Sequence, residues 1–266
     1  MSRRPNEVVI TGPCRSGTTL FSKLINDLPN TVCTIEVCPR LSALPSYFRE
    51  TREKIRRGEP IRNRYAKGGG GLTTNPWRDG AEDLAKPVDK ELGDDFLLAT
   101  KMVLGAVTHI EDLLKAGYPV ALIVRDPVYT LGSWTDPATA GQTVGMITDE
   151  NLHWWWKSHP FPWKHADAIK RRAEYWNWLA TMIHDARYPK QHEGENDVRL
   201  YRYEALVANP KAVLNSFLTS LGRPRIEEAP KLRNMNQDDR YPRLDDIRQA
   251  VRQLCPIAKT LGYRVP

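Results

Sequence analysis

Residues 10–25 read "ITGPCRSGTTLFSKLI", a stretch in which an apolar strand passes through a short glycine-containing loop into an amphipathic helix. The strand ends at Gly12 and the helix begins near Thr18. Backbone amides at a helix N-terminus attract anions, and parallel α/β sheets often place such a loop at the tip of a buried strand. The stretch therefore predicts an anion site at the carboxyl end of the first strand.

The loop differs from those that bind nucleoside triphosphates. In that pattern a lysine directly follows the second glycine, whereas here the position is Thr18 and Arg15 is the only cation of the loop. Gly12 and Gly17 allow the backbone to turn and to approach a ligand closely. We expect the guanidinium of Arg15 to add charge-assisted hydrogen bonds to the anion. The amides expected to face it are those of Ser16, Gly17, Thr18 and Thr19.

The rest of the chain alternates strands with helices, which is typical of a parallel sheet covered by helices on both faces. Short β-branched runs predict buried strands at 7–11, 31–35, 96–101, 120–124 and 197–203. Amphipathic patterns predict helices at 18–28, 107–116 and 170–186. No repeat or linker divides the chain, so we predict a single α/β domain over residues 1–266, with its ligands at the carboxyl ends of the strands.

Two segments interrupt this alternation. Residues 39–92 are rich in charge, lack a strong period and contain the run "KGGGG" at 67–71, so we expect a mobile insertion on the substrate side. Residues 135–165 include "NLHWWWKSHPFPWKH" and are expected to form an aromatic lid, whose tryptophans either contact a substrate or pack the lid onto the body.

Composition narrows the class of protein and of ligand. The net charge of +7 favours an acidic ligand or partner, without choosing among nucleic acid, anionic lipid and a phosphorylated small molecule. The four cysteines form no C-x-x-C pair, and we interpret them as reduced thiols of a cytoplasmic protein. We expect no signal peptide, because "MSRRPNEVVI" passes almost at once into the first strand, and no membrane span, because no apolar run reaches the required length.

A second element lies at 121–134, "ALIVRDPVYTLGSW". A buried strand ends at Arg125, Pro127 suits the first turn of the following helix, and Ser133 lies on that helix. Arg125 and Ser133 are the two candidate ligand-binding residues of this element. The alternative is an ordinary strand-to-helix turn in which Arg125 forms a surface ion pair with Asp126.

Together these stretches resemble the sulfotransferases that use 3′-phosphoadenosine 5′-phosphosulfate (PAPS). "GPCRSGTTL" is similar to the family's 5′-phosphosulfate loop. The R-D-P strand end with its later serine is similar to the 3′-phosphate element, which implies that Arg125 and Ser133 meet on one phosphate. "LYRYEALVANPKAVLNSFLTSLG" (200–222) resembles the family's late strand and helix, which implies that Tyr203 lies near the adenine, unless it is a core tyrosine. The resemblance implies a P-loop-containing sheet, PAPS as donor and 3′-phosphoadenosine 5′-phosphate (PAP) as product.

The chain departs from the cytosolic branch of that family at two places. It has "ATKMV" at 99–103, without the histidine base of that branch, and His109 is interpreted as structural. Instead of the basic R-K-G loop it has "RYPRL" at 240–244, so that Arg240 and Arg243 are the remaining candidates for a 3′-phosphate contact. The resemblance is therefore closer to the glycan- and tyrosylprotein-type enzymes.

The base is expected to be a carboxylate. Glu36 directly follows the second strand, where the glycan- and tyrosylprotein-type enzymes have a glutamate base, although an ion pair with Arg40 is an alternative role. Asp136 and Glu204 are less favoured candidates. Lys101, which ends the third strand of the sheet, is expected to be the second cation beside the sulfuryl group.

The reaction expected from this resemblance is in-line sulfuryl transfer to a hydroxyl or amine of a small-molecule or glycan acceptor. Arg15, Lys101 and the loop amides then stabilise the departing phosphate, and no metal is required. Histidines at 153, 159 and 165 do not match zinc spacing. The alternatives are a small-molecule kinase with a degenerate loop and, ranked last, a nucleic-acid-binding module, for which no motif is present. The sequence predicts neither the acceptor nor the oligomeric state.

Overall fold

The computed structural model describes residues 6–37, 41–67, 72, 81–103, 106–136, 164–187, 198–228, 232 and 241–265. Within these ranges a five-stranded sheet has the order β2-β5-β1-β6-β7, and each neighbouring pair of strands is parallel. Its strands are β1 (Glu7–Thr11), β2 (Thr31–Ile35), β5 (Leu97–Lys101), β6 (Val120–Val124) and β7 (Val198–Arg202). The five strands predicted from the sequence are confirmed, with ends that differ by at most one residue.

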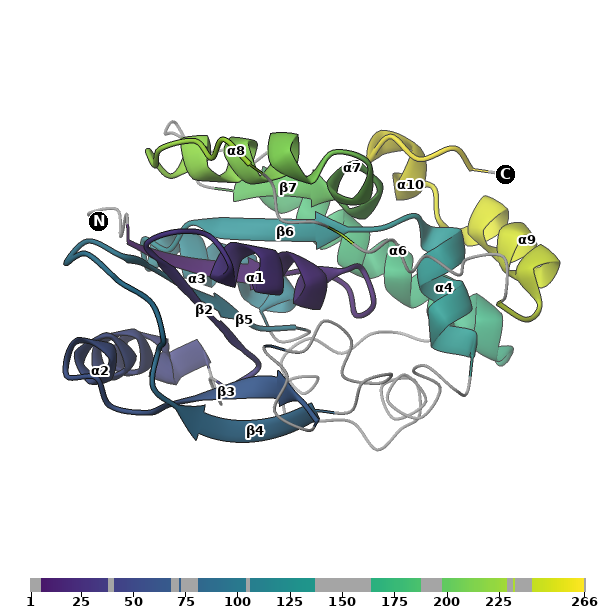
Figure 1. The fold of residues 1–266 in the computed structure, drawn as a ribbon. Coiled ribbons are helices and arrows are strands. Elements are labelled where there is room, and N and C mark those ends of the chain that lie inside the picture. Colours follow the sequence, from purple (N-terminus) through teal and green to yellow (C-terminus); the bar gives the residue numbers. More distant parts are fainter. Residues whose placement is uncertain are drawn as a thin grey trace.

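Helices cover both faces of this sheet (Figure 1). On one face, α1 (Thr18–Asn26) and α8 (Pro210–Ser220) pack against residues such as Val8, Ile10 and Ile123. On the other, α3 (Ile110–Lys115) and α6 (Ala168–Arg187) pack against Val9 and Leu122. Successive side chains of a strand point to opposite faces. The strands are therefore apolar throughout, because both of their faces are buried. The predicted α/β class is confirmed.

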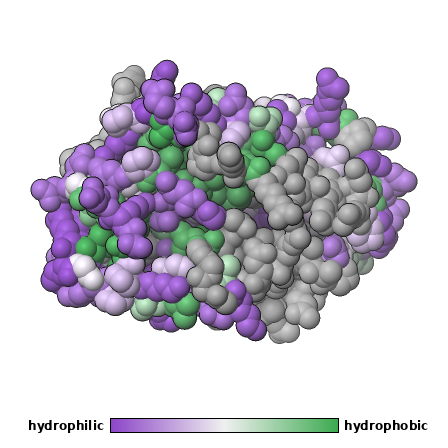
Figure 2. All heavy atoms as spheres, viewed as in Figure 1, coloured by the Kyte–Doolittle hydropathy of each residue, from purple (hydrophilic) through white to green (hydrophobic). Residues whose placement is uncertain are grey.

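The remaining helical elements lie around this core. They are η1 (Leu41–Ala43), α2 (Leu44–Arg56), η2 (Val107–His109), α4 (Pro127–Thr135), α7 (Tyr203–Ala208), α9 (Leu244–Leu254) and α10 (Ile257–Thr260). The predicted helix at 107–116 corresponds to η2 followed directly by α3. None of the described helices is long and apolar enough to cross a lipid bilayer. On the face in Figure 2 the coloured outer residues are largely hydrophilic, with hydrophobic patches between them.

The segment expected to be an insertion contains regular structure that its composition did not indicate. Helix α2 buries a narrow stripe of Leu44, Phe48 and Thr51 among many charged residues. Strands β3 (Ile61–Ala66) and β4 (Ala81–Lys86) form an antiparallel pair beside the sheet (Figure 1). The glycines at 68–71 lie outside the described residues, as does 137–163 of the expected lid. The mobility of the insertion remains a prediction.

Asn63 of β3 joins this hairpin to the edge of the central sheet. Its side-chain oxygen accepts a hydrogen bond from the Ile35 amide at 2.8 Å, and its amide group donates to the Cys33 carbonyl at 2.8 Å. Asn63 is 3% exposed. Because β2 is the edge strand, these bonds satisfy backbone groups that no further strand pairs. One side chain thus fixes the hairpin directly before Glu36.

We predict that Asn63→Leu lowers the free energy of unfolding by about 2 kcal/mol or more, because each buried polar group left without a partner costs about 1–3 kcal/mol. Urea denaturation of both proteins measures the difference. Arg62→Leu is the matched control, since Arg62 is an exposed residue of the same strand. Its effect is expected to stay within about 0.5 kcal/mol. Equal losses in the two variants would contradict the docking role of Asn63.

Candidate functional site

The residues singled out in the sequence follow the carboxyl ends of all five parallel strands. The glycine loop follows β1, Glu36 follows β2, Lys101 ends β5, Arg125 follows β6 and Tyr203 follows β7. In a parallel sheet these ends lie along one edge, which is where α/β proteins bind ligands. The structure therefore gathers the candidate residues at the place expected of a site.

The loop between β1 and α1 has a backbone that depends on its glycines. Gly12 and Gly17 have φ angles of 155° and 91°, and Arg15 has a φ of 67°, which is uncommon for a residue with a side chain. A Cβ atom at Gly12 would lie 2.1 Å from the Ile123 carbonyl oxygen, and one at Gly17 would lie 2.3 Å from the Tyr203 ring. Both glycines are thus required by close packing as well as by the turn.

Ser16 closes the loop on itself. Its hydroxyl donates to the Pro13 carbonyl at 2.6 Å, and its amide donates to the same oxygen at 3.2 Å. Ser16 is fully buried. A direct contact of its amide with an anion therefore remains a prediction, as it does for the amides of Gly17, Thr18 and Thr19.

Arg15, Arg125 and Ser133 converge from two different strand ends. The Arg15 Nε donates to the Ser133 hydroxyl at 3.0 Å, and the Arg125 Nη1 lies 3.5 Å from the Arg15 carbonyl oxygen. Arg125 also lies over the Tyr203 ring, 4.8 Å from its centroid. Burial lowers the pKa of Arg15, and the charge of Arg125 acts in the same direction. Two guanidinium groups this close favour the binding of an anion.

Two aromatic residues that the sequence analysis did not select support this arrangement. The indole of Trp134 is fully buried and donates to the Cys14 carbonyl at 2.9 Å, which ties α4 to the loop. Tyr241 packs on Gly132 of α4, where an added Cβ would lie 2.6 Å from its ring. Its hydroxyl is close enough to influence the pKa of Arg15. The "RYPRL" segment thus reaches the site through its tyrosine.

The two arginines of that segment are not placed at the loop by any described contact. Arg243 precedes α9, is half exposed and pairs with Asp246 at 2.8 Å. Arg240 lies outside the described residues. The phosphate contact of Arg243 remains a prediction.

The turn after β6 is built by a helix cap. The carboxylate of Asp126 accepts a hydrogen bond from the Val128 amide at 2.8 Å, and Pro127 begins α4. Burial raises the pKa of Asp126. Its carboxylate serves as the N-cap of the helix, which leaves Arg125 directed toward the loop and Tyr203.

Lys101 and Glu36 form the second half of the site. The Lys101 side chain is 3% exposed, and its ammonium donates to Glu36 Oε1 at 2.5 Å and to the Thr19 hydroxyl at 2.9 Å. The Glu36 amide also donates to the Lys101 carbonyl at 3.0 Å. Glu36 has a φ of 55°, an uncommon conformation that places its side chain beside the loop helix. Residues that follow or end three different strands are thus in direct contact through Lys101.

Arg64 of β3 is a further member that the sequence analysis did not select. Its Nη1 donates to Glu36 Oε2, and its Nε donates to Asp83 of β4 at 3.1 Å. Burial alone would raise the pKa of Glu36, but the charges of Lys101 and Arg64 outweigh it and lower that pKa below its ordinary value of 4.5. Glu36 is consequently a carboxylate at neutral pH.

The other candidates for acid–base or metal chemistry have structural contacts. Glu204 accepts a hydrogen bond from the Asp126 amide at 2.8 Å, and His109 contacts the Thr108 hydroxyl at 2.9 Å. His165 lies 3.5 Å from Glu174. Burial raises the pKa of Cys14 to about 12, so its thiol is neutral. Among the described residues no His, Cys, Asp and Glu side chains group as a metal site would require, and His153 and His159 lie outside that part.

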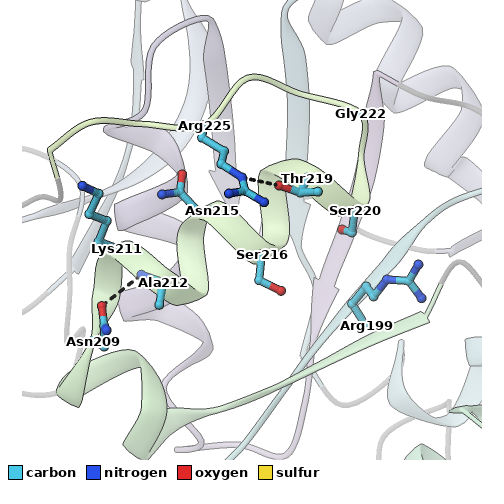
Figure 3. Close-up of a pocket in the computed structure, with 10 residues that line it drawn as sticks. All are labelled: Arg199, Asn209, Lys211, Ala212, Asn215, Ser216, Thr219, Ser220, Gly222 and Arg225. Atoms are coloured by element: carbon cyan, nitrogen blue, oxygen red, sulfur yellow. Dashed lines mark hydrogen bonds between the residues drawn. The ribbon is translucent and has the colours of Figure 1, made fainter.

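A groove lies away from these residues, along α8 (Figure 3). It has a volume of about 990 Å³ and is lined by side chains such as Arg199, Lys211 and Arg225. In Figure 3 Arg199 extends from β7 and Lys211 lies near the start of α8. None of the residues predicted to bind or react lines this groove.

Solved structures of similar fold are sulfotransferases. Sulfotransferase STF9 from Mycobacterium avium superposes with a TM-score of 0.52 at 16% identity, over 98% of this chain and 77% of that one. A sulfotransferase from Alicyclobacillus acidocaldarius gives 0.47 at 14% identity, over 98% and 95%. Mouse sulfotransferase SULT7A1, solved with PAP, gives 0.42 at 12% identity, over 100% and 81%. No protein-family model and no curated protein matches the sequence. The predicted resemblance is thus confirmed at the level of the fold.

We predict that Glu36→Gln destabilises the protein by about 3–5 kcal/mol, because the buried Lys101 ammonium then lacks its counter-charge. The double variant Glu36→Gln/Lys101→Met removes both charges and is expected to be more stable than Glu36→Gln alone. Urea denaturation at pH 7 provides the comparison. A double variant that is less stable than the single one would contradict this account.

The same ion pair predicts how stability depends on pH. Because folding lowers the pKa of Glu36, its carboxylate contributes stability above pH 4.5, and the contribution is lost as the pH falls through the folded-state pKa. The difference in melting temperature between wild type and Glu36→Gln should therefore be constant near neutral pH and narrow below about pH 4.5. A difference that widens toward acidic pH would contradict a lowered pKa of Glu36 in the folded protein.

Proposed function

We propose that this protein is a sulfotransferase, which moves a sulfuryl group from PAPS to a hydroxyl or amine of a small-molecule or glycan acceptor. The observation that carries the proposal is the meeting of Arg15 with Ser133 and Arg125 beside a loop that lacks the triphosphate lysine. The sulfotransferase-like fold supports it. A doubly anionic adenosine compound suits two cationic positions that are contributed by neighbouring strand ends.

The donor is assigned to residues of the two strand ends. Arg15 and the amides of the glycine loop would hold the 5′-phosphosulfate, since a helix N-terminus adds positive potential behind them. Arg125 and Ser133 would hold the 3′-phosphate, and Tyr203 would lie near the adenine. Gly17 lies against the Tyr203 ring, so the loop assigned to the 5′-phosphosulfate contacts the residue assigned to the adenine. Ser133 also contacts Arg15, so a bound 3′-phosphate would compete for this serine.

The reaction assigned to the site is an in-line displacement at sulfur. The S–O bond to the bridging oxygen breaks as the acceptor oxygen or nitrogen bonds to sulfur, and negative charge grows on the departing phosphate. Arg15 and Lys101 would stabilise that charge, because it is larger in the transition state than in the ground state. These cations would take the role that magnesium has in phosphoryl transfer.

Glu36 is the residue proposed to take the acceptor's proton. It is ionised at neutral pH and lies 2.5 Å from the Lys101 ammonium, so the base and one cation of the site are in contact. The lowered pKa makes it a modest base. It suits an acceptor whose own acidity rises as its atom bonds to sulfur, and it would remain active well below pH 7.

A kinase is the alternative enzyme, and the geometry does not favour it. The position that holds the phosphate-gripping lysine in triphosphate loops is Thr18, and the nearby lysine, Lys101, is engaged with Glu36 and Thr19. Such an enzyme would also require magnesium and would prefer ATP to PAP, which allows a direct comparison.

We predict that PAP raises the melting temperature of the protein and that ATP at the same concentration does so less. A ligand at one hundred times its Kd stabilises by about 2.7 kcal/mol, which is readily measured. Arg125→Ala should abolish most of the shift. Lys211→Ala removes an exposed cation of the distant groove and serves as the control for net charge. A larger shift with ATP would overturn the proposal in favour of the kinase.

We further predict metal-independent transfer of label from ³⁵S-PAPS to acceptors in a metabolite extract, in the presence of a chelator. Arg15→Ala and Glu36→Gln should each reduce the rate by at least 100-fold, because a positioned acid–base or charged group contributes about 10²–10⁴-fold. Folding of each variant is checked by circular dichroism. Transfer that persists in both variants would contradict the assigned roles.

A further inference from the structure

Both carboxylate oxygens of Glu36 are held, and they are held by different parts of the chain. Lys101, from the central sheet, contacts Oε1, whereas Arg64, from the β3–β4 hairpin, contacts Oε2. Lys101 is 3% exposed, while Arg64 and Glu36 are 28% and 29% exposed. The inner partner is thus buried in the core, and the outer partner lies partly in contact with solvent.

The outer contact has a rigid support. Arg64 is itself anchored through its Nε, which donates to Asp83 of β4 at 3.1 Å. The preceding residue, Asn63, is buried and bonds to the backbone of β2 through both the oxygen and the NH₂ of its side-chain amide. Arg64 and Asp83 are also direct partners in the register of the hairpin. A surface ion pair usually contributes little, but one held at both ends by backbone pairing is oriented in advance.

The carboxylate retains capacity for the reaction. An ionised carboxylate has about four lone-pair sites, and the contacts with Lys101 and Arg64 use two of them. An acceptor proton can therefore be received without displacing either cation. This geometry suits a division of roles in which Arg64 orients the carboxylate and adjusts its affinity for protons, while Glu36 itself contacts the acceptor.

We propose that Arg64 is a positioning residue for the Glu36 base, through which the hairpin insertion sets the orientation and basicity of the carboxylate. This inference rests on the proposed sulfotransferase function and assigns to the insertion a part in the reaction. The charged or titratable groups that face Glu36 from the described elements are Lys101, Arg64 and the neutral Cys14 thiol, with Asp83 behind Arg64. Removal of Arg64 leaves burial opposed by Lys101 alone.

The direction of the effect follows from these groups. Without the positive charge of Arg64, Glu36 binds a proton more readily, and an opposite charge at contact distance is worth about one unit of pKa or more. The acid limb of kcat/KM should therefore move upward by about one pH unit in Arg64→Gln. Because the side-chain contacts of Arg64 are with Glu36 and Asp83, and not with the residues assigned to the donor, the affinity for PAP should be unchanged.

The decisive experiment titrates Glu36 directly, without reference to activity. Protein labelled with [5-¹³C]glutamate is titrated by NMR, and the Glu36 signal is assigned by its loss in Glu36→Gln. Arg64→Gln is compared with wild type, with Arg64→Lys and with the matched control Arg62→Gln, an exposed arginine two residues away on the same strand. We expect an upward shift of about one pH unit in Arg64→Gln, substantial recovery in Arg64→Lys and no shift in Arg62→Gln.

The kinetic arm uses the same variants and the labelled-sulfuryl assay. A matching upward move of the acid limb in Arg64→Gln, with unchanged PAP affinity, supports the inference. An unchanged Glu36 titration in Arg64→Gln, or an equal shift in Arg62→Gln, overturns it while the proposed function stands. Failure of the wild-type protein to bind PAP overturns the proposed function, and with it the reaction assigned to Arg64.

Discussion

The site depends on one electrostatic constraint, the burial of the Lys101 ammonium at the end of a central strand. A charge this far from water needs a counter-charge and hydrogen bonds, and Glu36 and Thr19 supply them. These partners come from the segment after β2 and from the first turn of α1. The need of Lys101 for polar partners thus joins the carboxyl ends of the neighbouring strands β2, β5 and β1, and it holds the helix that follows the glycine loop beside a carboxylate.

The second cationic centre is held differently, by close packing around the loop. Trp134 ties α4 to the Cys14 carbonyl, and glycines allow Tyr203 and Tyr241 to approach. Arg15 and Arg125 are thereby kept near each other despite their like charges. The two centres have different physical origins: one is a compensated pair in the core, and the other stores repulsion that an anion would relieve. This difference suits the proposed function, in which one centre holds a dianion and the other keeps the carboxylate of Glu36 ionised.

The insertion changes the interpretation of the site most. Its charged, aperiodic sequence indicated an excursion from the domain, yet its hairpin bonds to the edge strand through Asn63 and contacts Glu36 through Arg64. The apolar signal of such a hairpin is weak because few of its side chains are buried. What attaches it is hydrogen bonding to backbone groups of β2, and a sequence pattern carries no sign of which asparagine will serve that purpose.

The sequence alone determined the sheet, because strands buried on both faces must be apolar throughout, and it determined that Gly12, Arg15, Glu36, Lys101, Arg125 and Tyr203 lie at strand ends. Only the tertiary structure decided which of these groups touch: that Lys101 bonds Glu36, that Arg15 bonds Ser133, and that Arg64 and Tyr241 join them. Periodicity records burial, which is a local property, whereas side-chain pairing depends on the register of distant elements, which is fixed only when the whole chain packs.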